Sequence, residues 1–140
     1  MEARRRQDID EPLVTLRRLR SNQDAPRAAR LVMEEILTLV DGYALGRRDD
    51  LVLSVSELVA NAVQYGAPGH LTLQIEATGS SVRIEVGDDG VDAFTWPDSI
   101  GPDGHWGLNL VMQMSDRWGI DRRPWTVAWC EFDLAVERSG

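Results

Sequence analysis

The sequence contains no lysine, and all fifteen of its basic residues are arginines. Without a lysine amine, the protein has no means of Schiff-base catalysis, no Walker-A phosphate-binding loop and no phosphate-binding lysine of the eukaryotic protein-kinase type. A phosphate site in this chain must therefore be built from backbone N–H groups, arginine side chains, helix N-termini or a metal ion.

Cysteine and histidine are also scarce, since the chain has only Cys130, His70 and His105. One cysteine cannot form a disulfide within the chain, and these three residues lack the clustered spacing of zinc ligands. No apolar run approaches the roughly 20 residues of a membrane span, and no apolar segment follows the arginine-rich N-terminus as in a signal peptide. We therefore expect a cytoplasmic protein with a buried thiol, without structural zinc and without a membrane partner.

The composition is that of an ordinary globular protein, with 140 residues, 43% of them hydrophobic and 27% charged, and it predicts a single domain. The net charge of -8 argues against direct binding of nucleic acid, which requires clustered basic residues. An acidic protein can still bind a nucleotide when Mg2+ supplies the positive charge.

Hydrophobic periodicity and turn residues predict eight elements. In chain order we expect a strand over Leu13–Leu19, a helix over Pro26–Val40 capped from Asn22–Asp24, a helix over Leu51–Tyr65 opened by Asp49 or Asp50, a hairpin of His70–Ala77 and Ser81–Val86, a helix over Trp106–Ser115, and a hairpin of Trp118–Ile120 and Trp125–Val136. Helices that do not alternate singly with strands argue against a doubly wound sheet. The expected fold is an α+β two-layer sandwich, in which a mixed, mostly antiparallel sheet is covered on one face by three helices.

The expected helix Leu51–Tyr65 is apolar on one side and polar on the other. Its polar stripe places Glu57 and Asn61 one turn apart, between Ser54 and Gln64. A carboxylate and a carboxamide in this arrangement can serve as a general base and as an oxygen ligand for Mg2+. The alternative is a solvated helix face, which the general exposure of polar residues favours when the stripe is considered by itself.

Three segments carry a family resemblance when taken in order: ELVANAV at Glu57–Val63, Asp88-Asp89-Gly90 after an expected strand, and GHWGLNLV at Gly104–Val111 opening an expected helix. They resemble the three boxes of the GHKL ATPase superfamily. With SDRWG at Ser115–Gly119, the chain is similar to the stand-alone anti-sigma-factor kinases of the histidine-kinase-like class. The resemblance implies the Bergerat ATP-binding fold in one domain over residues 12–137. Residues 1–11 are polar and without periodicity, and we expect them to form a flexible tail.

The resemblance also implies roles for individual residues. Glu57 matches the catalytic carboxylate, Asn61 the Mg2+ ligand, and Asp88 the aspartate that reads adenine. Gly90 matches a glycine that lets the backbone pass close to the base. The remaining implied nucleotide-binding residues are Gly104, Gly107, Leu108 and Thr126. Four tryptophans are expected to pack in the core or lid: Trp106, Trp118, Trp125 and Trp129.

The implied function is an ATP-binding regulatory protein that binds ATP with Mg2+ and transfers the γ-phosphoryl group to a serine or threonine of an antagonist protein. The implied partners are a sigma factor, the antagonist, and a second copy of the chain in a homodimer. Asp92, His105 and Trp125 depart from the family pattern, and they favour an alternative, a non-catalytic protein-binding module of the same fold. The catalytic domain of a two-component histidine kinase is disfavoured, because no helix pair with a phospho-accepting histidine precedes the boxes.

Overall fold

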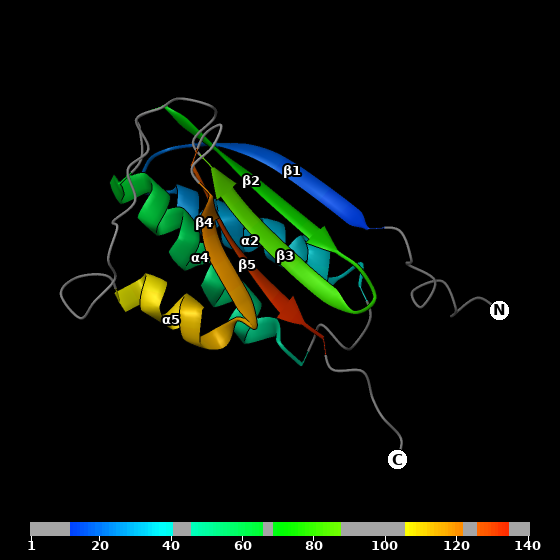
Figure 1. The fold of residues 1–140 in the computed structure, drawn as a ribbon. Coiled ribbons are helices and arrows are strands. Elements are labelled where there is room, and N and C mark those ends of the chain that lie inside the picture. Colours follow the sequence, from blue (N-terminus) through cyan, green and yellow to red (C-terminus); the bar gives the residue numbers. More distant parts are fainter. Residues whose placement is uncertain (1–11, 41–45, 66–68, 88–105, 122–125, 135–140) are drawn as a thin grey trace, which may run out of the picture.

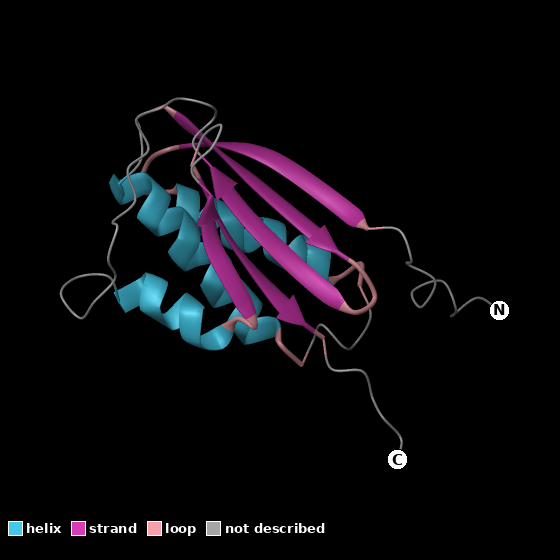
Figure 2. Cartoon of the chain, viewed as in Figure 1, coloured by secondary structure: helices cyan, strands magenta, loops and turns pink. Residues whose placement is uncertain are grey.

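A computed structural model describes residues 12–40, 46–65, 69–87, 106–121 and 126–134. Five strands form one sheet in the order β1-β2-β3-β5-β4, and every neighbouring pair is antiparallel. The elements in chain order are β1 (Leu13–Arg20), α2 (Ala25–Leu37), α4 (Arg48–Tyr65), β2 (His70–Ala77), β3 (Ser81–Gly87), α5 (Trp106–Met114), β4 (Arg117–Asp121) and β5 (Val127–Asp133). Helices α2, α4 and α5 lie together on one face of the sheet (Figures 1 and 2). The expected two-layer α+β sandwich is thus confirmed, and its described strand pairs are all antiparallel.

The core lies between the sheet and the helices. Alternate residues of β2, β3 and β5 are buried, as period-two side chains facing one layer must be. The apolar side of α4 meets them, with Leu51, Val55 and Val59 fully buried and Leu58 almost so. The predicted core face of α4 is therefore confirmed.

Helix boundaries differ slightly from those expected. Helix α2 has Pro26 in its first turn as predicted, and it ends at Leu37 rather than Val40. The Thr38 hydroxyl donates to the carbonyl oxygen of Glu35 at 2.7 Å, a local hydrogen bond that competes with continuation of the helix. Helix α4 begins at Arg48, so Asp49 and Asp50 lie within its first turn rather than before the helix. The helix dipole stabilises a carboxylate at this position.

The turn of the predicted hairpin between β2 and β3 is held by one side chain. The Thr78 hydroxyl oxygen accepts hydrogen bonds from the backbone N–H groups of Ser80 and Ser81, both at 3.1 Å. At the other end of β2, Gly69 adopts a φ of 111°, which favours glycine, and its carbonyl oxygen accepts from the N–H of Ser21 at 2.8 Å. These contacts close both ends of β2.

Candidate functional site

The polar stripe of α4 runs from the core to the surface. Ser54 is fully buried, Asn61 is 7% exposed, Glu57 is half-buried, and Gln64 is exposed. The alternative of a solvated helix face is therefore wrong for the two most buried members. The Ser54 hydroxyl is buried and has no hydrogen-bond partner among the described residues. The polar stripe of α4 is thus buried at Ser54 and Asn61 and reaches the surface at Gln64.

Asn61 is oriented by its own helix. Its Nδ2 donates to the carbonyl oxygen of Glu57 at 2.9 Å, which is the only hydrogen bond of this side chain within the described part of the chain. Because the nitrogen is bound, the carboxamide presents Oδ1 as an acceptor or ligand atom. A hard cation such as Mg2+ prefers ligand atoms of this kind, so the residue fits the ion.

The Glu57 carboxylate is set apart from the ion pairs of the described chain. Those pairs join arginines at helix ends or on the sheet to neighbouring carboxylates, whereas Glu57 takes part in no ion pair or side-chain hydrogen bond with a described residue. A half-buried carboxylate that is unpaired in this way is available to accept a proton from a bound hydroxyl or water.

The N-terminus of helix α5 lies toward the half of α4 that carries Glu57 and Asn61. The two helices pack against each other and run in opposite directions (Figure 1). Arg47, just before α4, donates from Nη2 to the carbonyl oxygen of Met114 at the end of α5, at 2.8 Å. The start of α4 therefore meets the end of α5, and the first turn of α5, with Gly107 and Leu108, lies toward the half of α4 that carries Glu57 and Asn61. A helix N-terminus of this kind favours phosphate.

The ends of two strands complete the arrangement. Gly87, the last residue of β3, pairs with Val127, the first residue of β5. Thr126 directly precedes Val127 and is 9% exposed, so it lies beside the point where the chain leaves β3 toward Asp88. The predicted positions Asp88, Gly90 and Gly104 lie outside the described residues, as do the departures Asp92, His105 and Trp125.

No cluster of three or more His, Cys, Asp or Glu side chains that could hold a metal occurs in the described ranges. Mg2+ that binds with a nucleotide takes one or two protein ligands and completes its shell with phosphate and water, and the Asn61 carboxamide oxygen is a ligand atom of this kind.

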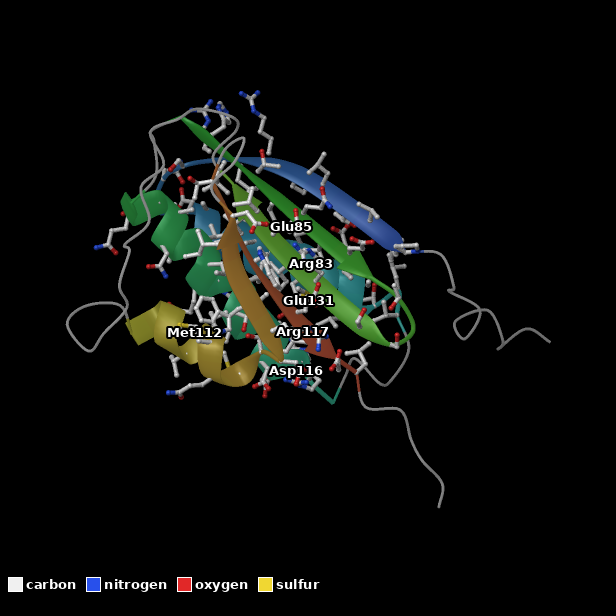
Figure 3. All side chains as sticks on the ribbon, viewed as in Figure 1. Arg83, Glu85, Met112, Asp116, Arg117 and Glu131 are labelled. Atoms are coloured by element: carbon white, nitrogen blue, oxygen red, sulfur yellow. The ribbon has the colours of Figure 1, made fainter. Side chains whose placement is uncertain are left out.

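A charged ladder occupies the face of the sheet opposite the helices (Figure 3). Arg83 donates to Glu85 and to Glu131, both at 2.6 Å, and Arg117 donates to Glu131 at 2.7 Å and to Asp133 at 2.5 Å. The hydrogen bond from Arg117, followed by that from Arg83, lowers the pKa of Glu131. Arg117 likewise lowers the pKa of Asp133. These charges are paired with one another, and they are separate from Glu57 and Asn61.

Trp129 belongs to this open face and not to the core. The guanidinium carbon of Arg83 lies 4.3 Å from the centroid of its ring, and the ring covers Gly119 of β4. Trp118 is 41% exposed. The expectation that both tryptophans pack in the core or lid is therefore wrong. Strand register places Trp129 on the uncovered face, and Trp118 lies on β4, the edge strand of the sheet. The Trp106 side chain and Trp125 lie outside the described residues.

Sequence reasoning does not single out Arg47 or Asp116. Asp116 stands within the SDRWG motif, and its carboxylate accepts from the N–H of Asp133 at 2.7 Å and from Arg47 at 3.2 Å. Asp116 could have been identified from its position directly after an expected helix, because aspartates at such positions often accept hydrogen bonds from backbone N–H groups. Nothing in the spacing identifies Arg47, since these partners lie more than sixty residues away in the chain.

No described helix is long and apolar enough to cross a membrane.

Among curated protein sequences, none matches this chain. A solved structure of the RsbU and RsbW domains of Rv1364c from Mycobacterium tuberculosis is similar in fold, with a TM-score of 0.62 and 23% sequence identity. The similarity covers 89% of this chain and 32% of that longer chain. The family profile of the histidine kinase-like ATPase domain matches residues 19–127. Because that match spans most of the sequence and the fold agrees with it, this chain belongs to the histidine kinase-like ATPase family.

Proposed function

We propose that this protein binds ATP with Mg2+ between the C-terminal half of α4, the N-terminus of α5 and the adjoining ends of β3 and β5. The observation that carries the proposal is the burial and hydrogen bonding of two side chains on one helix. Asn61 is nearly buried with its nitrogen bound to the Glu57 carbonyl oxygen, and the Glu57 carboxylate is unpaired within the described residues. Membership of an ATPase family supports the same ligand.

Each residue then has a distinct task. Bound Mg2+ neutralises negative charge on the phosphate oxygens. Asn61 offers Oδ1 as an oxygen ligand, and the first turn of α5 directs N–H groups toward phosphate. Glu57 accepts the proton of the attacking hydroxyl, whose oxygen bonds to the γ-phosphorus as the bond from that phosphorus to the β-phosphate oxygen breaks and ADP leaves. Asp88 is proposed to accept from the exocyclic amine of adenine, which selects ATP over GTP.

We propose that the hydroxyl belongs to a serine or threonine of an antagonist protein, and that a sigma factor is the regulated partner. The resemblance of the three boxes to anti-sigma-factor kinases supports this assignment, and so does the similarity in fold to a structure that contains an RsbW domain. Asp92, His105 and Trp125 favour the alternative of a protein-binding module without phosphoryl transfer.

The binding part of the proposal is tested with Asn61→Ala and, as a matched control, Gln64→Ala on the exposed end of the same stripe. Isothermal titration with ATP is carried out in Mg2+ and in EDTA. We expect Asn61→Ala to lose about tenfold or more of the affinity gained from Mg2+, since disturbing groups that support metal ligands already costs this much. Gln64→Ala should behave as the wild type. Equal Mg2+ dependence in both variants would contradict the role of Asn61.

The catalytic part is tested with Glu57→Gln, which keeps the size of the side chain and removes its basicity. We expect unchanged ATP affinity and loss of ATP turnover, measured as ADP release and as phosphate transfer to the antagonist protein. General bases contribute about 10²- to 10⁴-fold. Wild-type protein that binds ATP and turns over no more of it than Glu57→Gln would support the non-catalytic module instead.

A further inference from the structure

Arg47 joins the beginning of α4 to the ends of α5 and β5. Its Nη2 donates to the carbonyl oxygen of Met114 at 2.8 Å, and its Nη1 donates to the carbonyl oxygen of Asp133 at 3.0 Å and to Asp116 Oδ2 at 3.2 Å. Its guanidinium carbon lies 4.8 Å from the centroid of the Phe132 ring. One side chain therefore fixes the relative positions of three elements. We call Arg47, Met114, Asp116 and Asp133 the Arg47 network.

The place of Arg47 in the chain is unfavourable for α4 itself. The backbone carbonyl oxygen of Arg47 accepts from the N–H of Leu51 at 2.9 Å, so the residue stands at the N-terminus of α4, where the helix dipole disfavours a cation. The guanidinium group instead binds the carbonyl end of α5, where the dipole favours a cation and where backbone oxygens lack partners within the helix. Its Nε also lies 3.6 Å from Asp50 Oδ2 in the first turn of α4, so the side chain contacts the helix that it precedes as well as the end of α5.

Asp116 holds the network in place on the other side. Its Oδ2 accepts from the N–H of Asp133 at 2.7 Å as well as from Arg47, and its own N–H donates to the carbonyl oxygen of Glu131 at 2.9 Å. One hydrogen bond thus ties the carboxylate to the end of β5, and another ties the backbone of Asp116 to the same strand. Because a bonded carboxylate has little freedom, it restricts the guanidinium group that it contacts.

Helix α5 depends on this anchor. It has nine residues, too few for a stable helix in isolation. Helix α4 is the one element against which it packs extensively in the described structure. Among the side chains of α5 that the structure describes, those of residues 110–114, Val111 is buried and Leu110 is 40% exposed. Because the helix is short and packs extensively on one described element, a contact that fixes its C-terminus also restricts its direction.

We propose that Arg47 is a positioning residue for the ATP phosphates, acting through the C-terminus of α5 to hold the N-terminus of that helix in place. This inference rests on the proposed function, because it requires that the first turn of α5 meets phosphate. A rotation of α5 about its bound end moves the N–H groups of its first turn away from the phosphate oxygens. The proposed adenine contact is assigned to Asp88, which follows β3 in the chain and is not part of α5, so we expect adenosine binding to be independent of the network.

The test compares Arg47→Met with Arg48→Met in the full chain. Arg48 is the adjacent residue, and its guanidinium group forms exposed ion pairs with Glu34 at 2.7 Å and Asp49 at 3.2 Å, so its variant removes the same charge without touching α5. Affinities for Mg-ATP and for adenosine are measured by isothermal titration below the melting midpoint of every variant. Hydrogen exchange of residues 107–114 is followed without nucleotide.

We expect Arg47→Met to weaken Mg-ATP binding by about tenfold and adenosine binding by less than about twofold, since several charge-assisted hydrogen bonds that orient α5 are lost. Exchange in α5 should accelerate in this variant and not in Arg48→Met. Arg47→Lys keeps the charge without the planar fork, and it should restore part of the ATP affinity. Should Arg47→Met fail to fold, Arg47→Lys and Asp116→Asn provide the same comparison.

Equal losses of ATP and adenosine affinity in Arg47→Met would show a purely structural role and overturn the inference. ATP affinity equal to that of Arg48→Met would overturn it as well. Wild-type protein that binds neither ligand would instead refute the proposed function, and the positioning role would fall with it. Accelerated exchange of α5 in the Arg47 variant would then still show that the network anchors the helix.

Discussion

The contact between Gly119 and Trp129 makes a sharp prediction about the open face of the sheet. A Cβ atom at position 119 would lie 2.6 Å from Cζ2, 2.7 Å from Cε2 and 2.8 Å from Nε1 of Trp129. The other side of the ring is held by Arg83, whose guanidinium carbon lies 4.3 Å from the ring centroid. Gly119→Ala must therefore displace the ring and weaken its stacking with Arg83.

The expected cost follows from these contacts. Inserting a methyl group into a closely packed contact costs about 1 to 3 kcal/mol. Loss of the cation–π contact adds roughly 0.5 to 1 kcal/mol. We therefore expect Gly119→Ala to lower the free energy of unfolding by about 1.5 to 4 kcal/mol, the sum of these two effects.

Urea denaturation followed by circular dichroism measures this change. Trp129→Leu removes the ring that clashes, so it serves as the partner in a double-mutant cycle with Gly119→Ala. The double variant should be more stable than the sum of the single effects by about 1 kcal/mol or more, because the clash cannot occur without the ring. Additive effects, or a Gly119→Ala variant as stable as the wild type, would refute the close packing of Trp129 on Gly119.

Two further predictions concern ionisable groups. Hydrogen bonds from Arg117 and Arg83 lower the pKa of Glu131, so its contribution to stability is present above its unfolded pKa and is lost as the pH falls through the folded value. Glu131→Gln should accordingly be less stable than the wild type at neutral pH, and the difference should shrink below about pH 4 in urea titrations. A difference that stays constant with pH would contradict the ion-pair ladder. Burial raises the pKa of the Cys130 thiol to about 12, so iodoacetamide should leave native protein unmodified at pH 8 and alkylate it in urea, and rapid native alkylation would contradict its burial.

Helix α4 shows how far periodicity alone reaches. Its buried positions follow from the apolar spacing, since a helix packed on a sheet must bury one stripe. The same argument predicts both hairpins, because alternation and turn residues are local signals. Local signals also place Glu57 and Asn61 on one side of one helix. The exposure of that side depends on neighbouring elements, which the sequence of α4 does not encode.

The features that sequence reasoning misses depend on contacts distant in the chain. Arg47 binds residues of α5 and β5, and no local pattern distinguishes it from the neighbouring Arg48. Aromatic bulk predicts a core position for Trp129, yet the register of β5 turns it toward the open face. The insertion of β5 between β3 and β4 is also a tertiary choice, since the hairpin of β4 and β5 can join a sheet by either strand.

The most direct test of the proposed function is the titration of the wild-type protein with ATP and with GTP, in Mg2+ and in EDTA. The arrangement of Asn61, Glu57 and the α5 N-terminus predicts binding of ATP in the millimolar range or tighter in Mg2+. It also predicts clearly weaker ATP binding in EDTA, and the proposed adenine contact of Asp88 predicts weaker binding of GTP. No binding of ATP at millimolar concentration in Mg2+ would contradict the proposed function.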